Sequence, residues 1–288
     1  MLRYYVIRAE NMESALEALT EYGDKARLIA GGTDIMVQIR EKNSQLKEMK
    51  CLVDISGLQA LHTIMEDNET VHIGATVTHT EIVRSSIVQK YAPLLSQACS
   101  LVGSPQIRNT GTLAGAIANA SPASDIIPPL IALDSRITLR SKNSTRSVAS
   151  PDIFTGPYKT NIKPDEMIEK ISFRKLDSGY RTFYFKLGRR RALAIARLDM
   201  AVVSKVNGQG IVEDIRIVPG AIFESFGHAK KAEEILLGNL ADAETVNAAA
   251  KSVSKEMVER TGIRWSSEYK IPVVEEVARR ILSQVLEA

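Results

Sequence analysis

The stretch of sequence that decides the fold is Arg27-Leu28-Ile29-Ala30-Gly31-Gly32-Thr33-Asp34. Its apolar residues predict a short buried strand that runs directly into two adjacent glycines. Because glycine has no Cβ, Gly31 and Gly32 can adopt positive φ angles and let another group approach the backbone closely. Consecutive exposed N–H groups in such a turn form a concave anion site. An ordinary strand-to-helix turn fits the same residues, so this stretch alone leaves both interpretations open.

The residues around this turn predict a small βαβ unit over residues 1–56. Residues 1–10 and 51–55 read as strands, and Asn11 is the N-cap of a helix over residues 12–22. Strand, helix, strand, helix and strand in this order predict a parallel sheet. The glycine turn follows the carboxyl end of the strand that is second in chain order, where α/β sheets usually bind ligands.

Residues 57–175 predict a second lobe of mixed α+β type. Alternating segments on either side of Asp67-Asn68 indicate a hairpin. Helices are predicted over residues 80–85, 92–101 and 128–133, and strands over residues 137–139 and 168–173. The stretch from Gly103 to Gly115, rich in small and polar residues, is predicted to be a loop.

Residues 176–288 predict a C-terminal domain with a three-stranded antiparallel sheet beside helices. The second and third strands flank Asn207-Gly208-Gln209-Gly210, a strong hairpin turn. The predicted strands are 182–187, 199–206 and 211–218, and the predicted helices are 229–236, 243–260 and 272–286.

Composition excludes several classes of function. Of the 288 residues, 25% are charged and 44% apolar, and the net charge of +3 is too small and too dispersed for a general nucleic-acid surface. No apolar run is long enough for a signal peptide or a membrane span, so we expect a cytoplasmic protein. The two cysteines, Cys51 and Cys99, lie in apolar surroundings and read as reduced structural thiols. An iron–sulfur cluster needs about four thiolates, so any cluster must lie on another chain.

Further stretches carry polar groups that could bind a ligand or take part in a reaction. In residues 102–116, Arg108 could pair with a phosphate, although an Ω-loop packed by its own side chains is the alternative. Asp125 precedes an apolar helix and could simply cap it. Lys186 ends a strand and is followed by Arg189-Arg190-Arg191, which we interpret as a solvated face or a subunit contact. The four histidines show no metal-binding spacing: His62, His72, His79 and His228.

Three of these stretches occur in the order and spacing of one family: Ala30 to Asp34, Gln106 to Gly115, and Asn119 to Asp125. The chain resembles the FAD-binding medium subunit of the molybdenum hydroxylases, such as the flavin subunits of bacterial xanthine, nicotinate and carbon monoxide dehydrogenases. The resemblance covers essentially the whole length. It extends to Phe185-Lys186 and to Ser266-Ser267-Glu268-Tyr269 with Arg279.

The resemblance implies a fold and a set of cofactor contacts. The fold is a two-lobed FAD-binding domain of the vanillyl-alcohol-oxidase/PCMH-like type, followed by an α+β C-terminal domain, with FAD extended between the lobes. The resemblance assigns no catalytic residue. It implies that residues 189–198 form a loop near the flavin ring. The first pyrophosphate-binding loop matches Arg27, Leu28, Ile29, Ala30, Gly31, Gly32, Thr33 and Asp34. The second matches Thr112, Leu113, Ala114, Gly115 and Ala116, and the other cofactor-binding positions match Val102, Asp125, Ile168 and Lys186.

The second loop departs from the family pattern, which is commonly T-I-G-G-N. Ala114 replaces a glycine and narrows the allowed backbone conformations, and Ala116 replaces an asparagine and removes a side-chain donor and acceptor. We therefore expect weaker FAD binding or a shifted loop.

The resemblance implies an FAD-carrying electron-transfer subunit. A large partner subunit would carry the molybdenum cofactor and a small one the [2Fe–2S] clusters, in a dimer of heterotrimers, with NAD⁺ or another acceptor receiving the electrons. The hydroxylated substrate would bind on another chain. The alternatives are a stand-alone FAD-dependent oxidase and a scaffold subunit that has lost the flavin.

Overall fold

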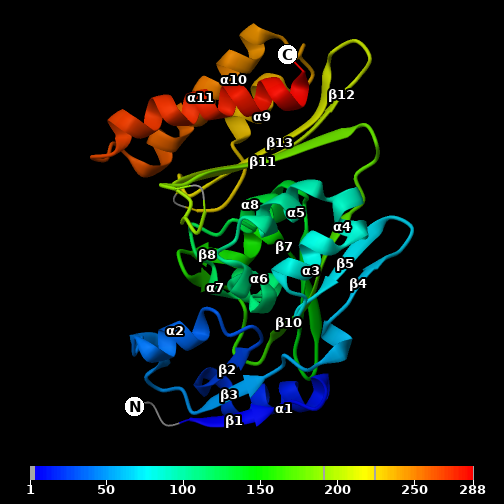
Figure 1. Ribbon diagram of the computed structural model, residues 1–288, viewed down its shortest axis with the longest axis vertical. Coiled ribbons are helices and arrows are strands. Elements are labelled where there is room, and N and C mark those ends of the chain that lie inside the picture. Colours follow the sequence, from blue (N-terminus) through cyan, green and yellow to red (C-terminus); the bar gives the residue numbers. More distant parts are fainter. Residues whose placement is uncertain (1–3, 191, 224, 288) are drawn as a thin grey trace.

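The computed structural model describes residues 4–190, 192–223 and 225–287. Figure 1 shows three parts along the long axis: a small N-terminal lobe, a helix-rich middle lobe, and a C-terminal sheet covered by helices. The chain is a mixture of helices and sheets, as predicted. Within the described ranges, no helix is both long and apolar enough to cross a membrane.

The N-terminal lobe is the predicted βαβ unit. Its parallel sheet has the order β1-β3-β2, so the strand before the glycine turn lies at an edge. Asn11 caps α1 in a capping box with Ser14, and Gly23, with φ of 50°, follows the helix. Residues 1–3 of the first predicted strand lie outside the described residues. The elements are β1 (Tyr5–Arg8), α1 (Met12–Tyr22), β2 (Ala26–Ile29), α2 (Ile35–Arg40) and β3 (Cys51–Asp54).

The middle lobe is built on a five-stranded sheet of order β4-β5-β10-β6-β7, in which every pair is antiparallel. A two-stranded sheet, β8–β9, lies beside it. The strands are β4 (Ile64–Glu66), β5 (Thr70–Gly74), β6 (Arg136–Arg140), β7 (Thr145–Ala149), β8 (Phe154–Gly156), β9 (Lys159–Thr160) and β10 (Met167–Arg174). The helices are α3 (His79–Arg84), α4 (Ser86–Tyr91), α5 (Pro93–Ser100), α6 (Pro105–Thr110), α7 (Leu113–Asn119) and α8 (Ile127–Ala132).

The prediction of a loop from Gly103 to Gly115 is wrong, because this stretch holds α6 and the start of α7. Ser104 caps α6 by accepting a hydrogen bond from the N–H of Ile107, and Pro105 occupies the first turn, where its missing N–H costs nothing. Thr112 caps α7 in the same way, accepting from the N–H of Gly115 at 3.1 Å. The polar residues that indicated a loop are therefore helix caps.

The C-terminal part is an antiparallel sheet of order β11-β12-β13 covered by helices (Figure 1). Its last helix begins five residues before the predicted start at Pro272, which lies inside the helix. Proline within the second turn removes one backbone hydrogen bond, and the helix continues to Leu286. The elements are β11 (Tyr180–Leu187), β12 (Leu198–Val206), β13 (Val212–Gly220), α9 (Lys230–Leu236), α10 (Ala243–Thr261) and α11 (Ser267–Leu286).

Strand β12 is buried on both faces. Ala201 and Val203 belong to a core that continues through the middle lobe into the N-terminal lobe, whereas Met200 and Val202 face the core under the C-terminal helices. Because side chains alternate along a strand, this double burial explains the nearly continuous apolar run of β12. One core thus spans the N-terminal and middle lobes and reaches one face of the C-terminal sheet, and a second core lies under the C-terminal helices. The boundaries 1–56, 57–175 and 176–288 remain a prediction.

Candidate functional site

The glycine turn connects β2 to α2 and leaves backbone donors open. Gly32 has φ of +72°, and its carbonyl accepts from the N–H of Met36 to start the helix. In the described part of the chain, the N–H groups of Gly31, Gly32 and Thr33 have no hydrogen-bond acceptor. Open N–H groups in such a turn form a site for an anion.

Gly31 makes the close contact between the N-terminal and middle lobes. A Cβ on this residue would lie 1.8 Å from the carbonyl oxygen of Thr110 and 2.9 Å from the Cα of Gly111. No side chain fits at these distances. The first loop therefore reaches the end of α6 only because residue 31 is glycine.

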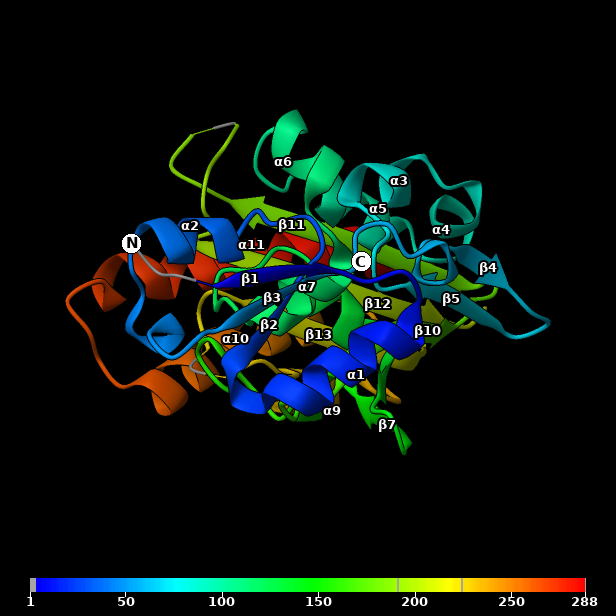
Figure 2. The same cartoon turned by 90° about the horizontal axis from the view of Figure 1, so that it is seen from below.

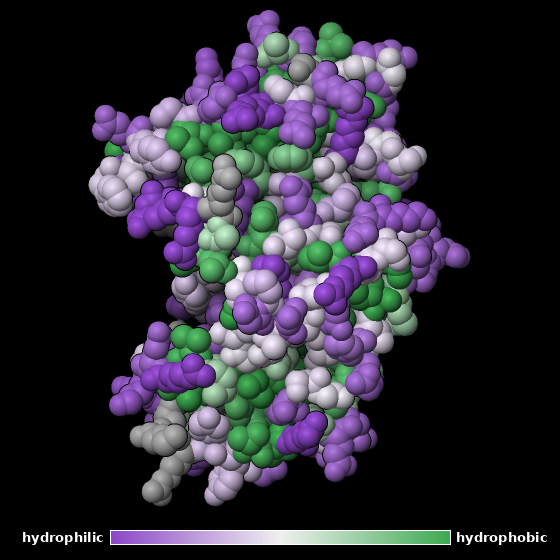
Figure 3. Space-filling model, viewed as in Figure 1, coloured by the Kyte–Doolittle hydropathy of each residue, from purple (hydrophilic) through white to green (hydrophobic). Residues whose placement is uncertain are grey.

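The two lobes border an open cleft of about 410 Å³ at this contact. Figure 3 shows the left side of the molecule hollowed between the lobe that carries α2 and the middle of the molecule. Lys163, Pro164 and Glu166, which lie just before β10, line another wall of the cleft. The cleft is lined by these predicted site residues: Arg27, Leu28, Ala30, Gly31, Gly32, Thr33, Asp34, Thr112 and Gly115.

A hydrogen-bonded chain joins α2 to α7 across the cleft. The amide of Asn119 donates to Asp34 Oδ1 at 2.7 Å, and its Oδ1 accepts from Gln38 Nε2 at 3.2 Å. Asp34 is exposed at its surface, but partial desolvation by its neighbours raises its pKa, while a hydrogen bond from Thr33 lowers it. Asp34 therefore serves as a tie between the lobes and forms no side-chain cap on α2.

The charges in the cleft are arranged in local pairs. Glu166 is almost fully buried and binds Arg146 through both oxygens, at 2.7 Å each. This hydrogen bonding with Arg146 lowers the pKa of Glu166, with burial opposing it. Arg27 Nη1 donates to the carbonyl oxygens of Asp24 and Ala26. Because Arg146 already balances the charge of Glu166, the nearby Lys163 can offer positive charge to an anionic ligand.

The second predicted loop is the first part of α7. Leu113 and Ala114 are buried in the core, and Ala116 packs partly against it, whereas Thr112 and Gly115 face the cleft. Ala114 lies within the helix, a conformation that alanine adopts readily. The glycine-to-alanine departure at residue 114 therefore falls on a core position of a regular helix.

Val102, Asp125 and Lys186 lie together, apart from the glycine turn. Lys186 Nζ donates to Asp125 Oδ2 at 2.6 Å and to the carbonyl of Leu101, next to Val102, at 3.1 Å. Asp125 forms no cap on α8, whose N-cap is Ile126. Ile168 is buried within β10, two residues beyond Glu166.

Several residues of the cleft and of the Asp125–Lys186 group were not predicted from the sequence. Asn119 and Gln38 lie far apart in the chain, and only the packing of α7 against the first lobe brings them together. Tyr184 and Asp199 hydrogen-bond beside Asp125. A usable signal existed for Asp199, since a carboxylate inside an apolar strand requires a partner.

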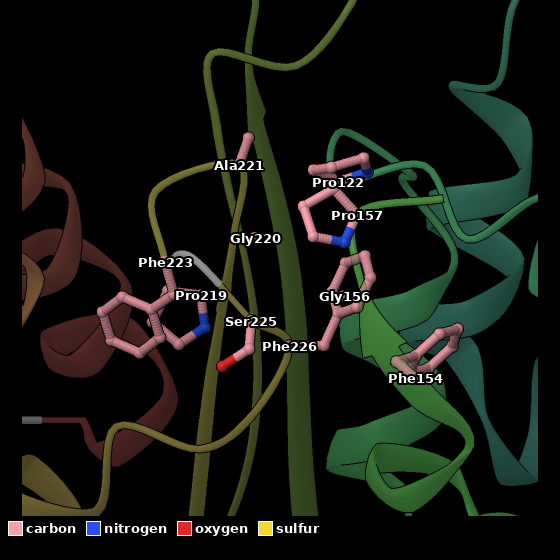
Figure 4. Close-up of a pocket in the computed structure, with 10 residues that line it drawn as sticks. All are labelled: Pro122, Phe154, Gly156, Pro157, Pro219, Gly220, Ala221, Phe223, Ser225 and Phe226. Carbon is pink, nitrogen blue, oxygen red and sulfur yellow. The ribbon is translucent and has the colours of Figure 1, made fainter. Parts of the chain in front are cut away.

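A smaller apolar cavity lies between β8 and the end of β13. Figure 4 shows the prolines and phenylalanines that line it, from Pro122 and Pro157 on one side to Pro219 and Phe223 on the other. The rings of Phe154 and Phe226 lie 4.7 Å apart at 55°. This contact joins the middle lobe to the C-terminal part.

The described residues contain no cluster of histidine, cysteine and acidic side chains that could hold a metal ion. Both cysteines are buried and unpaired. His79 is buried beside the second loop, and burial lowers its pKa to about 4, so that it is neutral at physiological pH. Arg189 and Arg190 are exposed, and Arg191 lies outside the described residues.

Comparison with known proteins assigns the chain to a family. Residues 2–173 match the FAD binding domain in molybdopterin dehydrogenase, and residues 183–285 match the CO dehydrogenase flavoprotein C-terminal domain. The glyceraldehyde dehydrogenase medium chain of Sulfolobus acidocaldarius is 32% identical over 280 residues, 97% of each chain. The nicotinate dehydrogenase FAD-subunit of Eubacterium barkeri is 29% identical over 282 residues, covering 96% of this chain and 94% of the relative.

A solved structure has the same fold over nearly the whole length. It is the carbon monoxide dehydrogenase from Hydrogenophaga pseudoflava that lacks the Mo-pyranopterin moiety of the molybdenum cofactor. The TM-score is 0.89 at 29% identity, covering 97% of this chain and 96% of that chain. The chain therefore belongs to the FAD-binding medium subunits of the molybdenum hydroxylase family and is part of an oxidoreductase.

Proposed function

We propose that this chain is the FAD-carrying electron-transfer subunit of a molybdenum-containing hydroxylase. It takes electrons from [2Fe–2S] clusters on a small partner chain and passes them to NAD⁺ or another acceptor. Hydroxylation takes place at a molybdenum cofactor on a large partner chain. The names of the relatives support this proposal, since they are medium chains or FAD-subunits of dehydrogenases.

The observation that carries the proposal is the cleft at the glycine turn. Open N–H groups of residues 31–33 and the side chain of Lys163 offer donors and positive charge, which suit a diphosphate. The open shape, with walls from both lobes, suits an extended ligand. The residues present therefore fit FAD, with the diphosphate at the turn.

Val102, Asp125, Ile168 and Lys186 complete the proposed FAD site, in which Ile168 and Lys186 would line the isoalloxazine and adenine ends of the cofactor. Lys186 is held in place by Asp125 and by a backbone carbonyl, so its ammonium group has a defined position. FAD, when bound, supplies the chemistry that accepts electrons singly and releases them as a pair. The role of this chain is to bind and orient that group.

The cysteine count supports a separate carrier of iron and sulfur. The chain has two cysteines, and both are buried, whereas a [2Fe–2S] cluster takes about four thiolates. We therefore assign the clusters and the molybdenum cofactor to partner chains, in a dimer of heterotrimers.

The test is the absorption spectrum of the purified chain, with and without added FAD. We expect one FAD per chain, released on denaturation. A chain that never takes up flavin would contradict the proposal and point to a scaffold subunit. Co-purification with its partners gives the second readout: a chain that oxidises an alcohol substrate alone is a stand-alone oxidase. NAD⁺ added to the substrate-reduced complex tests the acceptor, because its reduction is visible directly.

A further inference from the structure

Four polar side chains lie buried in a row between the middle lobe and the C-terminal sheet. They are Lys186 and Tyr184 of β11, Asp199 of β12, and Asp125 before α8. Lys186 lies 2.6 Å from Asp125, the Tyr184 hydroxyl lies 3.2 Å from the other oxygen of Asp125, and the same hydroxyl lies 3.0 Å from Asp199. The row runs from Lys186, a residue of the proposed FAD site, to Asp199, a buried acid to which the proposed function gives no role.

The hydrogen bonds in this row show which carboxyl group is protonated. Tyr184 has one hydroxyl hydrogen but has carboxyl oxygens on both sides. Burial raises the pKa of Asp125, whereas the hydrogen bond and the charge of the Lys186 ammonium group lower it and favour the ionised form. Tyr184 therefore donates to Asp125, and Asp199 must carry a proton and donate to the tyrosine oxygen.

The surroundings of Asp199 support a neutral acid. Its side chain is fully buried, and its Oδ1 has no partner among the described residues. A Cβ on Gly220 would lie 2.2 Å from that oxygen and 2.7 Å from Pro128, so the space is already filled. An ionised carboxylate without a donor is costly in such a place. Burial, and then the charge of Asp125, raise the pKa of Asp199 to about 8.

The other titratable groups that face the row leave this assignment unchanged. Burial and both aspartates raise the pKa of Tyr184 well above its ordinary value, so its hydroxyl keeps its hydrogen. Cys99 of α5 lies near Asp125, and burial raises its pKa too, so the thiol is neutral. The charges in the row are therefore those of Lys186 and Asp125.

We propose that Asp199 is a positioning residue of the flavin site: as a protonated acid it orients the Tyr184 hydroxyl toward Asp125 and thereby fixes the Asp125–Lys186 pair. The proposal rests on the proposed function, because it takes Asp125 and Lys186 as FAD contacts. Once Asp199 ionises at high pH, both carboxylates compete for one hydroxyl hydrogen, and the pair loses its fixed geometry.

The first test needs no flavin. The infrared spectrum of the full-length chain at pH 7 should contain the C=O band of a protonated, buried aspartic acid. The band should shift when aspartate side chains carry ¹³C, disappear as the pH rises past about 8, and be missing in Asp199→Asn. A wild-type chain without this band overturns the proposal, whether or not the variant folds.

The second test measures FAD affinity against pH. The amide of Asp199→Asn can donate to Tyr184 as the protonated acid does, so we expect the wild-type Kd at pH 7 and no weakening at pH 9. The wild type should weaken several-fold over that range, and Tyr184→Phe should bind FAD about tenfold more weakly at pH 7. Asp177→Asn, which changes an exposed carboxylate at the start of the same sheet, is the matched control and should follow the wild type.

The outcomes separate this inference from the proposed function. A tenfold loss of FAD affinity in Asp199→Asn at pH 7 overturns the inference, because a carboxylate would then be needed. A wild type that binds FAD with the same Kd at pH 7 and pH 9 overturns it as well. A wild type that shows the infrared band but never binds FAD contradicts the proposed function and supports the proton assignment.

Discussion

At the scale of single residues, Gly31 determines whether the two lobes can meet. The carbonyl of Thr110 occupies the space where any side chain of residue 31 would begin. Gly32 has a different reason to be glycine, since its φ of +72° is one that other residues adopt only with strain. The two adjacent glycines therefore serve packing and backbone conformation, respectively.

Replacing Gly31 with alanine should separate the lobes at the cleft. The added methyl would lie 1.8 Å from Thr110 O, so the turn or α6 has to move, and we expect a loss of roughly 1–3 kcal/mol of stability. FAD should bind at least tenfold more weakly, measured by titration of the apoprotein. Gly208→Ala, in an open hairpin turn with nothing within 4 Å, is the control. Unchanged FAD affinity in Gly31→Ala would contradict the placement of the site.

At the scale of elements, the Arg146–Glu166 pair joins β7 to the segment just before β10 at the wall of the cleft. Glu166 is buried and accepts from Nε and Nη2 of Arg146 and from the N–H of Lys163. Such bidentate pairing fixes geometry as well as charge. It thereby positions Lys163, which faces the cleft.

Replacing Glu166 with glutamine should destabilise the chain in a pH-dependent way. We expect a loss of about 2 kcal/mol at pH 7, less than for a fully buried pair, because Arg146 stays about one-third exposed. Pairing lowers the pKa of Glu166, so its contribution is present above the ordinary value of 4.5 and fades as the pH falls below it.

Urea unfolding of both chains at pH 7 and at pH 4 measures this difference. The gap in the free energy of unfolding should narrow at the lower pH. Glu276→Gln, which breaks an exposed ion pair on α11, should leave stability unchanged at both values. A gap that widens at low pH would show that the carboxylate is not stabilised by its partner.

At the scale of the whole molecule, the proposed ligand would connect parts that already share a core. The cleft has walls from residues 19–46, 112–119 and 158–166. The core of these parts continues to one face of β12. A ligand bound there favours the assembled state of both lobes at once.

Saturating FAD should therefore raise the melting temperature of the whole chain. At 100 times the Kd, linkage gives about 2.7 kcal/mol of added stability, which calorimetry detects as one shifted transition. Gly31→Ala should show a smaller shift at the same FAD concentration. A transition that splits in two, with only one part shifted, would mean that the lobes unfold independently.

The sequence by itself determined the βαβ unit, the three-stranded C-terminal sheet and the family. These features depend on apolar periodicity, turn residues and motif spacing, all of which are local. The local signals also had limits. Ser104 and Thr112 cap helices in a stretch that we predicted to be a loop, because cap residues and loop residues are of the same types.

Only the tertiary structure decided which distant groups meet. It placed Asn119 against Asp34, Gly31 against Thr110, and Tyr184 between two carboxyl groups. The partners in these contacts lie tens of residues apart or on different strands, and their distances depend on how whole elements pack. Because hydrogen bonds and proton positions change over fractions of an ångström, no periodicity in the sequence specifies them.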